Sequence, residues 1–125
     1  MNLTYYGHSC FGVEVNGKHL LFDPFITGNS LAKSIDSNNI PVNYILISHA
    51  HGDHVADVEA IAKQTKAKLI SNYEIFLYYE KKELKGHGMN FGGSWQFDFG
   101  KVTYVVALHS SQFPDGTYGG NPGGF

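Results

Sequence analysis

Hydrophobic and polar positions alternate with a period of two over the first part of the chain. Residues 2–6 and 10–15 fit two strands, and Asn16-Gly17 joins the second of them to a third strand over 19–22 through a tight hairpin turn. A proline shortly after this third strand takes the chain out of the sheet, because proline cannot donate to a strand ladder. The pattern therefore predicts an antiparallel start followed by a polar loop over 25–41.

The middle of the chain alternates between strand and helix periodicity. An apolar run at 42–48 predicts a buried strand, and residues 55–65 carry apolar side chains at helical spacing. A short strand follows at 68–71, and Asn72 is placed to cap a second helix over 73–84. This order predicts a sheet with helices packed on one of its faces.

The last third of the chain returns to a period of two. Residues 94–99 and 101–108 alternate on either side of Gly100, which predicts a hairpin whose second strand leads directly to His109.

Glycines gather at 86–93 and 116–124, where they predict turns and loops. The predicted fold is a mixed α/β structure with mainly antiparallel strands and helices on one face. The length of 125 residues predicts a single domain over 1–125.

Composition narrows the class of protein. With 42% hydrophobic residues the chain can bury a core, and its net charge of −2 without a basic block gives no indication of nucleic acid or membrane binding. We expect no secretory signal, because the N-terminus lacks a charged start followed by a long apolar stretch. The single Cys10 cannot form an internal disulfide, which favours a reducing compartment, and we expect a cytoplasmic protein.

The candidate chemistry is concentrated in the run His49-Ala50-His51-Gly52-Asp53-His54, directly after the buried strand. Imidazole and carboxylate are ligands that zinc, iron and manganese accept. Alternate side chains of an extended segment point the same way, so His49 and His51 can bind one cation together. Gly52 allows a sharp turn, beyond which Asp53 and His54 can face a second cation. The alternative is a solvated, histidine-rich turn without metal.

This run resembles the His-x-His-x-Asp-His signature of the metallo-β-lactamase superfamily. Several other stretches look like one branch of it, the uncharacterised metal-dependent hydrolases related to the L-ascorbate-6-phosphate lactonases. These stretches are Gly7-His8-Ser9-Cys10-Phe11, Phe22-Asp23-Pro24, Gly88-Met89-Asn90 with Gly92-Gly93, and Leu108-His109-Ser110-Ser111. The resemblance implies a four-layer αβ/βα sandwich with a dinuclear metal site, of which this chain would be the N-terminal half, truncated before the second.

The resemblance also implies a ligand set. His49, His51 and His109 would bind the first metal, and Asp53 and His54 would bind the second. We expect one or two divalent ions, with zinc favoured over manganese or iron. The bridging aspartate and the last histidine of the family site have no counterpart in this chain, which leaves open whether the chain is an enzyme by itself.

Two residues are expected around these ligands. Asp23 stands at a strand end and is a candidate acceptor for the N–H of a ligand imidazole, the alternative being a simple turn residue before proline. His8 either lines the pocket or belongs to an ordinary turn.

Two functions follow from these expectations. The first is a metal-dependent hydrolase in which metal-activated water attacks a small ester, lactone or phosphodiester, while Asp53 orients or deprotonates the water, or ligates a second metal. The second is a catalytically incomplete metal-binding half domain that self-associates, because half a sandwich leaves one sheet face uncovered. We expect a small-molecule substrate and a homo-oligomer, with no nucleic-acid or membrane partner.

Overall fold

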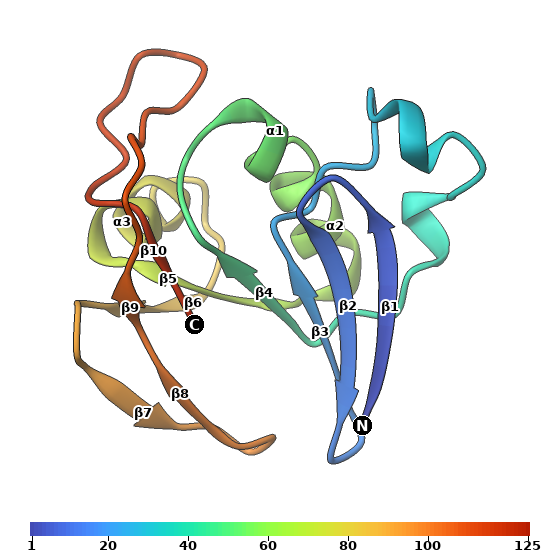
Figure 1. The fold of residues 1–125 in the computed structure, drawn as a ribbon, viewed down its shortest axis with the longest axis horizontal. Coiled ribbons are helices and arrows are strands. Elements are labelled where there is room, and N and C mark those ends of the chain that lie inside the picture. The colour runs from blue at the N-terminus through green and yellow to red at the C-terminus, as the bar shows by residue number, and fades with distance from the viewer.

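The computed structural model describes residues 1–125 and contains a central six-stranded sheet (Figure 1). Its strands are β1 (Asn2–Gly7), β2 (Cys10–Val15), β3 (Lys18–Phe22), β4 (Tyr44–Ile47), β5 (Lys68–Asn72) and β6 (Gly86–Met89). The helices are α1 (Gly52–Val55), α2 (Val58–Thr65) and α3 (Tyr73–Glu80), with 3₁₀ turns at Ser30–Ala32 and Ser37–Asn39. Two smaller sheets pair β7 (Ser94–Gln96) with β8 (Lys101–Thr103), and β9 (Val105–Val106) with β10 (Gly123–Gly124). None of the helices combines the length and the apolar character that a membrane span requires.

The strands of the central sheet lie in their sequence order, β1 to β6. The first three are antiparallel neighbours, whereas β3, β4, β5 and β6 are parallel neighbours. The mixed α/β class is confirmed, and parallel pairs outnumber antiparallel ones inside this sheet. Because parallel strands end at the same edge, the residues that follow β3 and β4, Asp23 and Ser48, come together there.

Side chains of β4 alternate between two hydrophobic clusters, one on each face of the sheet. Ile45 and Ile47 belong to a cluster of 19 buried residues that includes Ile61 of α2 and Ile75 of α3. The face that carries Ile45 and Ile47 is therefore the one covered by the helices, as the periodicity predicts.

The opposite face is not left bare, so the expectation of an uncovered sheet face is wrong. Tyr44 and Leu46 of β4 pack there in a second cluster of eight buried residues, with Phe99, Val102 and Tyr104. These last three come from the predicted 94–108 hairpin, which is shorter than expected because Val105 and Val106 leave β8 to pair with β10. The chain thus covers this face with its own C-terminal third.

The helix predicted over 55–65 is interrupted. Of its residues only Val55 belongs to α1, and α2 starts only at Val58. The interruption coincides with Asp57, whose carboxylate accepts hydrogen bonds from the backbone N–H groups of Ile26 (2.6 Å) and Thr27 (2.9 Å). Asp57 thereby fixes the loop after β3 to the start of α2, a role that the apolar spacing could not indicate.

The glycines at 86–88 form a strand and not the predicted turn. A Cβ on Gly86 would lie 2.7 Å from the carbonyl oxygen of Leu69, and a Cβ on Gly88 would lie 2.9 Å from the Tyr73 ring. These glycines are required because β6 lies against both β5 and α3, where no side chain fits. The second helix also ends earlier than predicted, at Glu80, while its Asn72 cap is as expected, with Oδ1 accepting from the Ile75 N–H at 2.8 Å.

Candidate metal centre

The candidate site lies at the edge where β3 and β4 end. The loop after β4 contributes His49 and His51, and α1 contributes Asp53 and His54. His109 arrives from the segment after β9, about sixty positions later in the chain. The structure therefore brings together the five residues that the sequence singled out as ligands.

His49, His51 and His109 form a compact group. Their potential ligand atoms all lie within 4.8 Å of one another. The ring centroid of His49 lies 4.8 Å from that of His51 and 4.4 Å from that of His109, and the latter two are 5.0 Å apart. Three imidazoles at such distances form a donor set that a divalent cation accepts.

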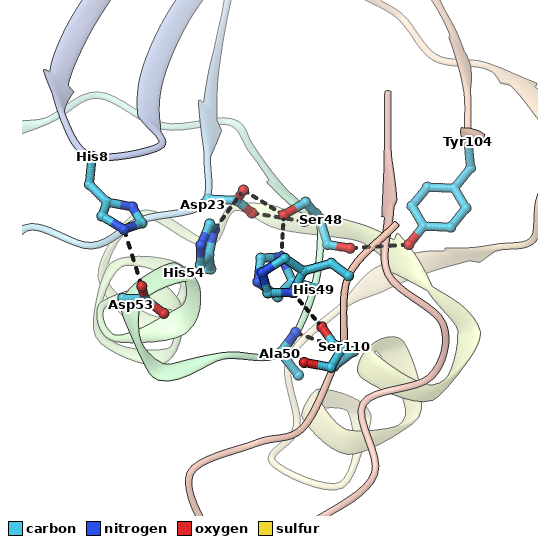
Figure 2. A network of polar contacts seen from close by, with 11 residues as sticks. His8, Asp23, Ser48, His49, Ala50, Asp53, His54, Tyr104 and Ser110 are labelled. Carbon is cyan, nitrogen blue, oxygen red and sulfur yellow. Dashed lines mark hydrogen bonds and ion pairs between the residues drawn. The ribbon is translucent and has the colours of Figure 1, made fainter. Parts of the chain in front are cut away.

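The ring of His49 is held in place by Ser48 and Asp23 (Figure 2). The Ser48 hydroxyl donates to Asp23 Oδ2 at 2.6 Å, so its oxygen is free to accept the Nδ1–H of His49 at 2.9 Å. The other ring nitrogen, Nε2, is buried and has no hydrogen-bond partner. A buried polar atom without a partner is costly, and a cation bound there would satisfy it. The residues therefore fit the metal that the resemblance implies.

His49 is also kept neutral by its surroundings. Burial lowers the pKa of its imidazole to about 4, and the nearby His54, His109 and His51 act in the same direction, against the opposing charge of Asp23. A neutral imidazole has the lone pair that a metal ligand requires.

Asp23 also holds His54. Its Oδ2 lies 3.0 Å from His54 Nδ1, and its Oδ1 accepts the Ser48 backbone N–H at 2.7 Å. The Asp23 side chain is thus placed as the sequence suggested, beside the N–H of a candidate ligand. Because Nδ1 of His54 donates to Asp23, its Nε2 is left to face the site.

The loop around Ser110 orients the remaining two histidines. His109 Nδ1 lies 2.8 Å from the carbonyl oxygen of Ser110, which leaves Nε2 of His109 available, and His51 Nε2 lies 3.3 Å from Ser110 Oγ. Ser111 fixes this loop to the histidine run, since its Oγ accepts from the Ala50 N–H at 3.1 Å. The loop is therefore built into the same edge of the sheet.

A second group consists of His8, Asp53 and His54, whose potential ligand atoms also lie within 4.8 Å of one another. His8 Nε2 lies 3.1 Å from Asp53 Oδ2 (Figure 2). Burial raises the pKa of the Asp53 carboxyl, but its own backbone N–H and the neighbouring His54 and His8 outweigh this and hold the pKa below its usual value. Asp53 is accordingly an anion at neutral pH.

Sequence reasoning assigned no role to Ser48. The position of Ser48 was the one available signal. Ser48 directly follows β4 and precedes His49, and Asp23 directly follows β3, the adjacent parallel strand. Tyr104 was assigned to the sheet only, yet its hydroxyl donates to the Ser48 carbonyl oxygen at 3.2 Å and supports the same strand end.

Comparison with known protein families identifies the family of the chain. Residues 3–124 match the model of the metallo-beta-lactamase superfamily. The chain belongs to this superfamily. Among solved structures, this superfamily member is similar to Igni18, a metallo hydrolase from the hyperthermophilic archaeon Ignicoccus hospitalis, with 37% identity, a TM-score of 0.85, and coverage of 98% of this chain and 53% of that one.

Curated relatives carry the description UPF0173 metal-dependent hydrolase. One from Flavobacterium johnsoniae is 63% identical over 125 residues, and YtkL from Bacillus subtilis is 46% identical over 129 residues. The match covers 100% and 99% of this chain, but 56% of either relative. The chain thus spans about half the length of the curated relatives it matches.

Proposed function

We propose that the chain provides the cation-binding part of a metal-dependent hydrolase, with His49, His51 and His109 as ligands of the first cation. The observation that carries this proposal is the buried, unpaired Nε2 of His49 beside the other two imidazoles. The relatives described as metal-dependent hydrolases support the same class of activity.

A divalent cation at these histidines would act as a Lewis acid and lower the pKa of its water from about 16 to about 7. The protein's part is to aim the imidazoles inward. Asp23 orients His54 directly and His49 through Ser48, and the Ser110 carbonyl orients His109.

Asp53 is the proposed catalytic residue. Its carboxylate is half exposed and anionic, so it can accept a hydrogen bond from the attacking water or take its proton. Asp53 and His54 would together hold a second cation. The proposed substrates are small esters, lactones or phosphodiesters. Water would attack the carbonyl carbon of an ester or lactone, or the phosphorus of a phosphodiester.

Zinc is the proposed cation, with manganese and iron as alternatives, because three imidazoles with an open fourth position suit zinc.

We place the protein in the cytoplasm on the basis of its one cysteine, Cys10, which is fully buried and unpaired.

Turnover with and without the cation tests the proposal. Zinc-loaded and chelator-treated protein would be assayed on a lactone, a carboxylic ester and a phosphodiester, together with the His109→Ala variant and a His19→Ala control. We expect cation-dependent hydrolysis of at least one substrate, lost in His109→Ala and retained in His19→Ala. Equal rates in chelator and in zinc would contradict the proposal.

A second candidate is a metal-binding half domain that self-associates without turnover. It is favoured by exposed apolar side chains on the C-terminal third of the chain: Trp95, Val105, Val106, Leu108 and Tyr118. This candidate predicts a homo-oligomer in which zinc raises the melting temperature while none of the three substrates is hydrolysed. Hydrolysis that depends on His109 would reject it.

A further inference from the structure

The structure contains a donor set that the sequence did not suggest. We propose that His8 is a third ligand of the second cation site, together with Asp53 and His54. This inference rests on the proposed function and adds a residue to it, because the resemblance implies only Asp53 and His54 from this chain.

The geometry brings three donors from two separate elements to one point. Their potential ligand atoms lie within 4.8 Å of one another, and His8 Nε2 is 3.1 Å from Asp53 Oδ2. The ring centroids of His8 and His54 are 5.0 Å apart. Figure 2 shows the His8 ring pointing from the turn between β1 and β2 toward Asp53 at the start of α1.

The backbone around His8 is held in an unusual conformation. His8 has φ 55° and Gly7 has φ 103°, and a Cβ on Gly7 would lie 2.7 Å from Leu31 Cβ. The Tyr5 hydroxyl donates to the His8 carbonyl oxygen at 3.1 Å. A non-glycine residue in the left-handed region is uncommon and persists where surrounding contacts fix it, often at functional positions. Here the contacts fix the ring of His8 beside Phe25 and His54.

A third ligand answers a requirement of the site. Asp53 and His54 are adjacent in α1, and adjacent helical side chains do not face each other, so two ligands from one turn enclose a cation poorly. His8 approaches from another element. Since the Nδ1 of His54 is committed to Asp23, the set consists of His8 Nε2, an Asp53 oxygen and His54 Nε2. Two imidazoles and one carboxylate with open positions suit iron(II), manganese or zinc.

The alternative to a cation site is a simple surface ion pair between His8 and Asp53. Their side chains are 36% and 50% exposed, and exposed pairs contribute little to stability. An ion pair of this kind would require no cation and would leave the number of bound cations unchanged when it is removed. Cation stoichiometry therefore separates the two interpretations.

The experiment is a calorimetric titration of the chelator-treated chain with cobalt(II) and, separately, manganese(II), supported by elemental analysis. The test variant is His8→Asn, because asparagine tolerates the left-handed conformation, and His19→Asn on β3 is its matched control. We expect two cations per chain in the wild type and in His19→Asn, and one in His8→Asn. Asp53→Asn is a second test variant and is expected to show the same loss.

The outcomes distinguish this inference from the proposed function. Two cations with unchanged affinities in His8→Asn would overturn the role of His8. A single cation in the wild type, lost in His109→Ala, would also overturn it and leave the proposed function standing. No cation in the wild type would overturn both.

Discussion

Asp23 Oδ2 lies 3.0 Å from His54 Nδ1, and the same oxygen accepts a hydrogen bond from the Ser48 hydroxyl. The Ser48 hydroxyl in turn accepts a hydrogen bond from the ring N–H of His49. One buried carboxylate therefore orients two imidazoles that belong to the two separate ligand groups. Each ring presents its Nε2 to the site as a consequence, and the two groups are coupled through a single side chain.

Replacing Asp23 with asparagine is expected to weaken cation binding by about 10- to 100-fold, because residues that orient metal ligands typically contribute this much to affinity. Asparagine tolerates the positive φ of 43° at this position, so the backbone should persist. Calorimetric titration with zinc measures the change. Asp36→Asn is the control, since Asp36 is exposed and caps a 3₁₀ turn in a way that asparagine can reproduce. Equal affinities in the two variants would contradict the role of Asp23.

Ser48→Ala should weaken binding at the first cation through loss of the His49 contact, by about 10-fold. Because Asp23 acts on His49 through Ser48, the effect of Ser48→Ala and that of Asp23→Asn should not add in the double variant. A double-mutant cycle measures this, using the zinc affinities of the wild type, the two single variants and the double variant. Ser94→Ala, at an exposed position, is the control. Strict additivity would show that Ser48 and Asp23 act independently.

The stability of the cation-free chain should fall as the pH is lowered from about 6.5 to about 4. The pKa of His49 is about 4 in the folded chain and 6.5 ordinarily, so in this window the unfolded chain binds the additional proton. The shift corresponds to at most about 3 kcal/mol. Urea unfolding in chelator at about pH 7 and about pH 4.5 measures it, with His49→Gln expected to lose less stability than the wild type. Identical losses in both chains would contradict burial of a neutral His49.

Gly86→Ala should destabilise the chain by about 1–3 kcal/mol, because the new methyl group would lie 2.7 Å from the backbone oxygen of Leu69, which cannot move away without shifting β5. Gly124→Ala is the control, since its nearest contact would be Val105 Cγ2 at 3.6 Å. The urea midpoint reports the difference. A midpoint in Gly86→Ala equal to that of Gly124→Ala would show that β6 is not packed as closely as described.

Turns and helix caps were predicted correctly where they depend only on residues close together in the sequence. The Asn16-Gly17 hairpin and the Asn72 cap follow from turn and cap preferences, and both are present. Gly86 and Gly88 were misinterpreted because the reason for a glycine there is a neighbouring element, which the sequence does not reveal. The break before α2 has a similar cause, since Asp57 bonds to a loop thirty positions away.

The candidate site was predictable in its ligand types but not in its supporting groups. The spacing of His49 and His51 indicates a shared cation, whereas the approach of His109 rested on resemblance and depends on how the C-terminal third folds back onto the sheet. His8 was expected either to line the pocket or to form an ordinary turn. Its approach to Asp53, like the contact of Ser48 with His49, depends on which strand ends and turns meet at one edge.

The most direct test of the central claim compares bound cation in the wild type and in His109→Ala, purified in parallel without chelator and analysed for zinc, manganese and iron. His109 lies far from the histidine run in sequence and within 4.4 Å of His49 between ring centroids. The account predicts that the variant contains one cation per chain fewer than the wild type while its far-ultraviolet circular dichroism is unchanged. An unchanged cation content in a folded His109→Ala chain would contradict it.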